Sequence, residues 1–191
     1  MNKTDIILAG VGGQGILSIA AAIGYAALNQ DLHIKQAEVH GMSQRGGAVQ
    51  SHLRIADVPI YSDLIPKGTA EIILSVEPLE SLRYIEWLRK DGWLITSDHP
   101  FKNIPVYPDL DSIYHEIARF NNHKLISAEQ IASDLHAPKS SNMVMLGAAS
   151  HFLPLEEQHL LDAISWLFKS KGDAIIEQNH KAFTTGRDAA K

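Results

Sequence analysis

The chain has 191 residues, of which 45% are hydrophobic and 20% charged, with a formal net charge of −5, which is typical of one globular domain with a substantial core. The negative balance without a run of Lys and Arg argues against nucleic-acid binding, no apolar stretch reaches the ~18 residues that span a bilayer, and the first residues do not resemble a signal peptide. The absence of cysteine excludes disulfides, a cysteine nucleophile and thiolate ligation of an iron–sulfur cluster.

The first predicted elements are a strand, a glycine-rich turn and a helix. The apolar run 5–9 leads into Gly10-Val11-Gly12-Gly13-Gln14-Gly15, and the Ala-rich stretch 16–28 follows without a proline. A glycine loop in this context can bind a phosphate, because its backbone can approach a ligand closely and the first N–H groups of the helix favour an anion. A tight turn for helix–sheet packing is the alternative interpretation. The candidate ligand-binding residues of this loop are Gly10, Gly12, Gly13, Gln14 and Gly15.

A second glycine-rich loop, 40–47, follows a predicted strand at 33–39. Arg45 offers a planar guanidinium for a phosphate or carboxylate, and the glycines beside it allow close approach. A surface arginine in a loop is the alternative. His40 and Ser43 are too close in sequence to indicate a nucleophile–base pair, so we expect no catalytic residue in this chain. The candidate ligand-binding residues of this loop are Ser43, Gln44, Arg45, Gly46 and Gly47.

The remaining elements continue to alternate along the chain. Apolar runs and turn signals predict strands at 48–55, 58–61, 71–76, 93–97 and 124–126. Helical patterns cover 77–90, 112–120, 155–168 and 173–183, and residues 127–130 resemble a capping box that opens a further short helix. Asn142 begins another helical stretch and is a further candidate ligand-binding residue, although an N-cap or first-turn role also explains it.

This order of elements predicts the fold class. Strands that alternate with helices indicate a single three-layer α/β/α domain over residues 1–191, Rossmann-like, with a mostly parallel sheet whose strand order the pattern does not determine. Ligands of such sheets gather beyond the carboxyl ends of the strands. Both glycine loops follow strands, so we expect them to share that edge.

A nicotinamide site is one interpretation of these loops. Glu38 ends the predicted second strand, about 20 residues beyond the first loop, where a Rossmann site holds the ribose hydroxyls. However, a simple dehydrogenase does not need a second loop rich in Gly, Gln and Arg, and no general acid is evident. A P-loop is excluded, because Ile16 and Leu17 stand where that motif needs Lys and Ser or Thr. The histidines at 33, 40 and 52 have no metal-ligand spacing, so we expect no metal site.

The two loops together carry a family resemblance. Gly10-Val11-Gly12-Gly13-Gln14-Gly15, followed by His40-Gly41-Met42-Ser43-Gln44-Arg45-Gly46-Gly47 and Val49 to Arg54, resembles the gamma-type domain of 2-oxoacid:ferredoxin oxidoreductases. The likeness is strongest to the branch that acts on indolepyruvate, since relatives acting on 2-oxoglutarate usually differ before Arg-Gly-Gly. Further matches at 77–80, 142–147 and 179–186 extend it over essentially the whole chain.

The resemblance implies an enzyme of two kinds of chain. In that family a large (alpha) subunit carries thiamine diphosphate and the iron–sulfur clusters, decarboxylates an aryl pyruvate and passes electrons to ferredoxin, and coenzyme A takes the acyl group to give an arylacetyl-CoA. The small subunit alone would bind no cofactor and would help to close the site. The lack of cysteine agrees with this division, and so does the lack of a catalytic pair.

From the resemblance we expect both glycine loops to face the active site of the partner. The N–H groups at 12–15 would contact an anionic group, Arg45 would bind a phosphate or carboxylate, and coenzyme A is the leading candidate ligand. We expect a cytoplasmic complex. A stand-alone NAD-binding dehydrogenase that uses Glu38 and a nucleotide-sensing regulatory domain are the alternatives.

Overall fold

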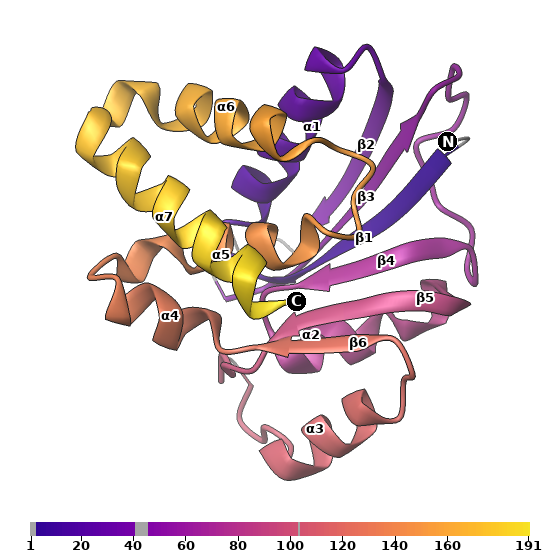
Figure 1. Ribbon diagram of the computed structural model, residues 1–191. Coiled ribbons are helices and arrows are strands. Elements are labelled where there is room, and N and C mark those ends of the chain that lie inside the picture. The colour runs from indigo at the N-terminus through magenta and orange to yellow at the C-terminus, as the bar shows by residue number, and fades with distance from the viewer. Residues whose placement is uncertain (1–2, 41–45, 103) are drawn as a thin grey trace.

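A computed structural model describes residues 3–40, 46–102 and 104–191 (Figure 1). Six strands form one sheet in the order β2-β3-β1-β4-β5-β6. Only β3 runs antiparallel to its neighbours, and the pairs β1–β4, β4–β5 and β5–β6 are parallel. Five strands therefore point the same way, which confirms the mostly parallel sheet. The strands are β1 (Lys3–Val11), β2 (His33–His40), β3 (Ala48–Ala56), β4 (Ala70–Ser75), β5 (Leu88–Ser97) and β6 (His123–Ile126).

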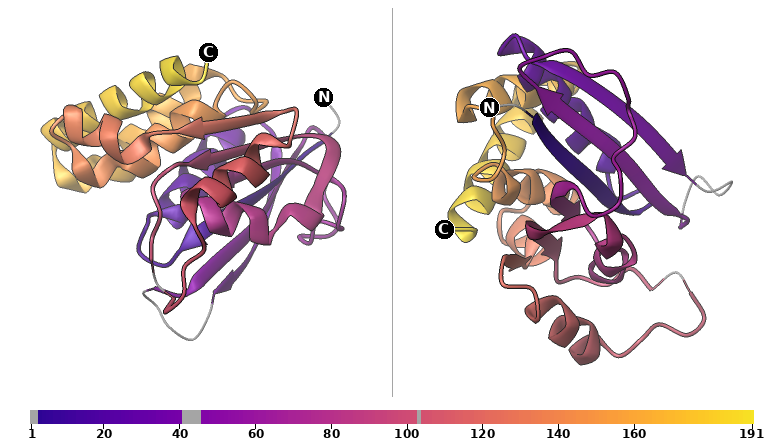
Figure 2. Two further views of the ribbon diagram at one scale, coloured as in Figure 1. Left: turned by 90° about the horizontal axis from the view of Figure 1, so that it is seen from below. Right: turned by 90° about the vertical axis from the view of Figure 1, so that its right-hand side faces the viewer.

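Helices cover both faces of the sheet, which confirms the three-layer prediction. Figures 1 and 2 show α1, α5, α6 and α7 on one face and α2 and α3 on the other. Short 3₁₀ turns occupy 85–87, 138–140 and 169–171. None of the described helices is long and apolar enough to cross a membrane. The helices are α1 (Ile16–Asn29), α2 (Pro78–Arg83), α3 (Leu110–Ala118), α4 (Ala128–Asp134), α5 (Ser141–Ala149), α6 (Glu157–Phe168) and α7 (Asp173–Ala189).

The central strand β1 explains why the chain begins with an apolar run. Its alternate side chains enter two separate cores: Ile6 and Leu8 pack into the core under α1, whereas Ile7 joins the core under α3. A parallel strand covered on both faces needs apolar residues at consecutive positions rather than at every second one. Ala-rich α1 packs closely in the first core, because its alanines at 20, 22, 26 and 27 are all buried there.

Several predicted boundaries are wrong. Residues 58–61 form a loop and not a strand, in keeping with Pro59, which cannot donate to a ladder. The helix predicted at 77–90 ends at Arg83, because Leu88 already pairs with Ala70 as the first residue of β5. The last helix runs on to Ala189 rather than ending at 183.

The capping box predicted at 127–130 is also wrong. Ser127 does precede α4, but its side chain makes no hydrogen bond to the helix. Its hydroxyl donates instead to the carboxylate of Asp98, at the end of β5. Ser127 therefore ties the carboxyl ends of two neighbouring strands together, a long-range role that a local sequence pattern does not reveal.

Candidate functional site

The two glycine loops lie side by side at the carboxyl edge of the sheet. The Gly12 N–H donates to the Gly47 carbonyl at 2.8 Å, and the Gly46 N–H donates to the Gly12 carbonyl at 3.2 Å. Val11 is opposite Ala48 in the antiparallel pair β1–β3, so these bonds continue the ladder beyond the strands. The expectation that both loops share one edge is confirmed.

Gly15 joins the first loop to α1 and to a distant helix. It is the N-cap of α1 with φ of 80°, a left-handed conformation that favours glycine. A Cβ atom here would lie 2.4 Å from Asn142 Nδ2. That amide donates to the Gly15 carbonyl at 3.2 Å, and its Oδ1 accepts the Met143 N–H at 3.1 Å. Asn142 therefore occupies the first turn of α5 and fixes the position of the first loop.

The start of α1 presents unpaired backbone donors. Within the described part of the chain, no hydrogen bond is made by the backbone N–H groups of Gly13, Gly15 and Ile16. Gly13 is exposed, and a Cβ atom placed on it would meet no atom of the described residues within 4 Å. These donors stand at the positive end of a helix of 14 residues, which is a favourable place for an anionic group.

The side chain of Gln14 is held by the protein itself. Its Oε1 accepts the Val11 N–H at 2.8 Å, and its Nε2 donates to the Val76 carbonyl at 3.2 Å. The amide thus bridges the ends of β1 and β4 and shapes the loop. A direct contact between Gln14 and a ligand stays a prediction.

A buried carboxylate continues this edge beyond β4. Glu77 is 1% exposed and caps α2 by accepting the Glu80 N–H at 2.7 Å. Its other oxygen accepts the Phe101 N–H at 3.2 Å and the Tyr107 hydroxyl. Glu77 therefore anchors the 98–109 connection, which leads from β5 to α3, against the start of α2. The sequence indicated only a helix start at this position.

Burial raises the pKa of both groups of this pair. Desolvation raises the pKa of the Glu77 carboxyl above its usual value, and the hydrogen bonds from Tyr107, Glu80 and Phe101 partly offset that rise. Burial, followed by the bond to Glu77, also raises the pKa of the Tyr107 phenol, which stays protonated and donates. Ionised Glu77 is therefore less favourable in the folded protein than in the unfolded chain, so its contribution to the free energy of unfolding falls as the pH rises through the raised pKa.

Exposed apolar side chains surround the same edge. They belong to the first turn of α1, the end of β2 and the 98–109 connection, and Val106 is 83% exposed. Apolar residues that gather at one edge of a domain are typical of a surface that another chain covers. We call this set the edge residues: Leu17, Val39, Phe101, Ile104 and Val106.

Three candidates, Ser43, Gln44 and Arg45, lie outside the described residues, so their contacts stay predictions.

Glu38 is exposed on β2, and β3 separates it from β1. Two strand spacings are about 10 Å, whereas a Rossmann dinucleotide site needs the second strand next to the first. The strand order thus argues against the nicotinamide interpretation. No group of three His, Asp or Glu side chains in the described ranges can hold a metal ion.

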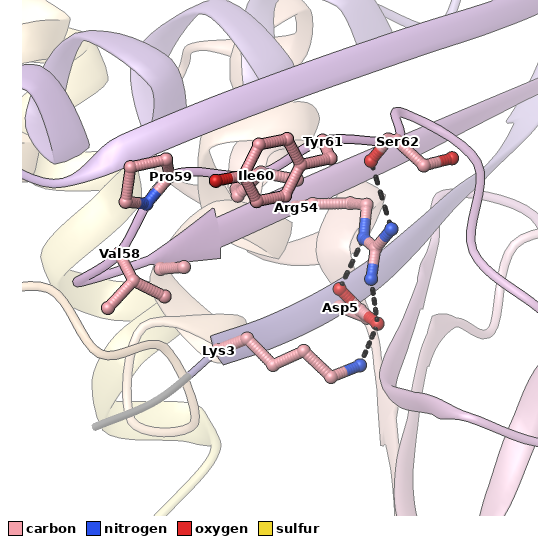
Figure 3. A pocket seen from close by; sticks show the side chains of 9 residues that line it. Lys3, Asp5, Arg54, Val58, Pro59, Ile60, Tyr61 and Ser62 are labelled. Carbon is pink, nitrogen blue, oxygen red and sulfur yellow. Dashed lines mark hydrogen bonds and ion pairs between the residues drawn. The ribbon is translucent and has the colours of Figure 1, made fainter.

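The opposite edge of the sheet has a cavity of about 440 Å³ (Figure 3). Asp5 is fully buried beneath it and accepts bonds from Arg54 Nε at 2.8 Å and Nη2 at 3.2 Å. Lys3 also pairs with Asp5, and Arg54 Nη1 donates to the Ser62 carbonyl at 2.9 Å. These polar groups satisfy one another and hold the loop after β3, so we interpret this cavity as structural.

Fold and site together define an α/β domain whose sheet edge presents two paired glycine loops. Residues 5–189 match the family model described as pyruvate ferredoxin/flavodoxin oxidoreductase, and the chain belongs to that family. It is 36% identical to indolepyruvate oxidoreductase subunit IorB of Pyrococcus horikoshii, over all of this chain and 98% of that protein. The corresponding subunit of Archaeoglobus fulgidus is 35% identical, over 98% and 96% of the two chains. Identity falls to 27% for 2-oxoglutarate synthase subunit KorC of Methanocaldococcus jannaschii, over 99% and 95%.

Solved structures share the fold at lower identity. A 2-oxoglutarate:ferredoxin oxidoreductase from Magnetococcus marinus, bound to 2-oxoglutarate, coenzyme A and succinyl-CoA, superposes with a TM-score of 0.78 at 22% identity. The match covers all of this chain but only 31% of that longer chain. Pyruvate oxidoreductase subunit PORC from Thermotoga maritima has a TM-score of 0.71 at 19% identity, over 98% and 97% of the two chains.

Proposed function

We propose that this chain is the small subunit of an indolepyruvate:ferredoxin oxidoreductase, and that it completes the site of a larger subunit. The observation that carries the proposal is the edge that the two glycine loops share. The hydrogen bond from the Gly12 N–H to the Gly47 carbonyl holds these loops together there. Full-length identity of 35–36% to two indolepyruvate oxidoreductase subunits supports this substrate class. The reaction would be oxidative decarboxylation of an aryl pyruvate to an arylacetyl-CoA with reduction of ferredoxin.

In this proposal the two subunits divide the chemistry. The larger partner carries thiamine diphosphate, which supplies the electron sink for decarboxylation, and the iron–sulfur clusters that deliver electrons to ferredoxin. This chain has no cysteine with which to bind such a cluster. Its own part is to bind and orient: the N–H groups of Gly13, Gly15 and Ile16 receive an anionic group of coenzyme A, and the edge residues pack against the partner. A cytoplasmic location belongs to the same proposal.

The first experiment is an oxygen-free affinity purification of the chain from its native cells. We expect a large brown partner that contains thiamine, and reduction of an electron acceptor that depends on both indolepyruvate and coenzyme A. Recovery of the chain alone, without that activity, would contradict the proposal. Titration of the chain with NADH then tests the dehydrogenase alternative, which predicts tight NADH binding. The position of Glu38, two strands away from β1, argues against that alternative.

The second experiment tests Arg45 in the reconstituted complex. Arg45→Ala should lower kcat/KM for coenzyme A by about tenfold or more, the scale of one lost charge-assisted hydrogen bond. Arg119→Ala is the matched control, because Arg119 is an exposed arginine at the C-cap of α3 whose partner is Glu116 in that helix. Full activity of the Arg45→Ala complex would show that Arg45 does not bind coenzyme A.

A further inference from the structure

A second cavity, of about 470 Å³, has no residue of the first glycine loop among its described lining residues. One wall is the connection 136–140 between α4 and α5, and the other is the corner between α6 and the first turns of α7. Figure 1 shows α4 and α7 side by side, and the two helices are in contact. A volume of this size suits a small organic ligand.

Positively charged side chains line the cavity. Lys139 and Lys171 both line it, and none of its described lining residues is Asp or Glu. Neither lysine has an ion-pair partner among the described residues. Two free ammonium groups from segments far apart in the sequence favour a ligand with about two negative charges, and lysine commonly binds phosphate as a point charge.

Two buried polar side chains also reach this cavity. Ser140 is 4% exposed and Asn179 is 3% exposed, and both are lining residues. Asn179 Nδ2 donates to the Ile175 carbonyl at 2.8 Å, whereas its Oδ1 and the Ser140 hydroxyl make no hydrogen bond within the described ranges and neither oxygen is fully buried. Both oxygens are therefore open to the cavity, where the hydroxyl can donate a hydrogen bond to a ligand and the amide oxygen can accept one.

The rest of the wall is apolar. Phe168 and Ile175 come from either side of the α6–α7 corner. An inorganic ion alone would leave this surface in contact with water. A flat organic body would cover it and gain the free energy of apolar burial.

We propose that this cavity binds a nucleoside monophosphate group, with the phosphate between Lys139 and Lys171 and the base against Phe168 and Ile175. The Ser140 hydroxyl donates to a phosphate oxygen, and Asn179 Oδ1 accepts a hydrogen bond from a base amino group or a ribose hydroxyl. The group can belong to a free nucleotide or to the nucleotide end of a larger carrier such as coenzyme A. The site does not depend on the proposed oxidoreductase activity.

Calorimetric titration of the purified full chain with AMP, adenosine and inorganic phosphate tests the proposal. AMP should bind saturably, and adenosine should bind about tenfold or more weakly because it lacks the charge-assisted contacts. The double variant Lys139→Gln/Lys171→Gln should weaken AMP binding by about tenfold or more. Lys169→Gln is the matched control, because this exposed lysine of the same 3₁₀ turn is not among the described lining residues of the cavity. The affinity of this variant for AMP should stay within about twofold of the wild-type value.

A filling variant and a competition complete the test. Ile175→Trp should block AMP binding, because the larger side chain occupies the apolar wall. Competition by coenzyme A would identify the carrier as the source, and its absence would identify a free nucleotide. The proposal is overturned if AMP fails to bind the wild-type chain, or if it binds the double lysine variant equally well. AMP binding and competition by coenzyme A are both measured on the chain without its partner subunit. An absence of AMP binding would therefore not bear on the proposed oxidoreductase role.

Discussion

At the scale of single residues, the first glycine loop depends on one contact between distant segments. Gly15 combines a left-handed backbone with a Cβ position already filled by Asn142. Gly15→Ala should therefore lower the free energy of unfolding by about 2–3 kcal/mol, of which the left-handed conformation accounts for about 1–2 and the lost Asn142 hydrogen bond for about 1. Urea denaturation of the purified chain measures this change.

A double-mutant cycle separates the two causes. In an Asn142→Ala background the nearest atoms, Nδ2 and Cγ, are absent, so Gly15→Ala should cost only the conformational part, about 1–2 kcal/mol. Equal costs in both backgrounds would mean that Asn142 does not constrain the loop. The cycle also tests whether the position of α5 determines the shape of the glycine loop.

A second prediction at this scale concerns Glu77 and the pH dependence of the free energy of unfolding. Its pKa is raised in the folded protein, so the folded state binds the proton more tightly than the unfolded chain does. The resulting stabilisation is full below the usual glutamate value of about 4.5 and is lost as the pH rises through the raised value. Glu77→Gln should remove this loss, which is followed from pH 4.5 upward.

The measurement is the difference in unfolding free energy between wild type and variant over that range. Glu86→Gln is the control, because Lys67 lowers the pKa of that exposed carboxyl and its contribution has the opposite sign: it is present above the usual value and lost as the pH falls. A wild-type minus Glu77→Gln difference that does not change with pH would contradict the assignment.

At the scale of elements, α5 and α7 cross at two glycines. A Cβ atom on Gly147 would lie 1.9 Å from the Phe183 carbonyl oxygen, and one on Gly186 would lie 2.0 Å from the Val144 carbonyl oxygen. Both neighbours are backbone, which cannot turn aside as a side chain does. Gly147→Ala and Gly186→Ala should each lower the free energy of unfolding by about 3 kcal/mol or more, at the upper end of overpacking costs.

Gly24 of α1 provides the control for this crossing. Its added Cβ would meet only Ile34 Cδ1, at 3.3 Å, and this side-chain end can shift. Gly24→Ala should therefore be neutral or stabilise by up to about 1 kcal/mol, from better helix propensity. Thermal unfolding of the three variants compares them directly. Similar losses at Gly24 and Gly147 would show that helix–helix distance is not the cause.

Most elements were predictable because their signals are local. The run 5–9, the glycine turn and the Ala-rich stretch specify β1, the first loop and α1 within a few residues of the observed bounds. Two of the errors come from contacts between distant segments. Pairing of Leu88 with Ala70 shortens the helix after Glu77, and the crossing at Gly186 lengthens α7.

The candidate site shows the same division. That both loops share an edge followed from strands preceding each of them, and the bond between Gly12 and Gly47 confirms it. The roles of Gln14 and Asn142 as braces of the loop were not predictable, since their partners are 62 and 127 residues away. The strand order, which weakens the Glu38 interpretation, was likewise not readable from any local pattern.

At the scale of the whole molecule, the two edges of the sheet differ in what they leave unpaired. The amino edge closes on itself through the buried pair of Asp5 and Arg54. The carboxyl edge leaves backbone donors at Gly13 and Gly15 without a partner among the described residues, whereas exposed apolar side chains lie at both edges. This asymmetry is what a subunit needs if one face completes a partner's site and the other only supports the fold.

The asymmetry predicts which edge the large subunit covers. Val106 is 83% exposed and Tyr61, at the amino edge, is 93% exposed, so neither substitution to Asp should unfold the chain. Val106→Asp places a charge inside the proposed apolar contact, and it should reduce recovery of the complex in co-purification by about tenfold or more, because an unpaired charge is costly to bury. Tyr61→Asp should assemble like wild type. If Tyr61→Asp blocks assembly and Val106→Asp does not, the partner covers the amino edge, and the glycine loops cannot form the wall of a shared site.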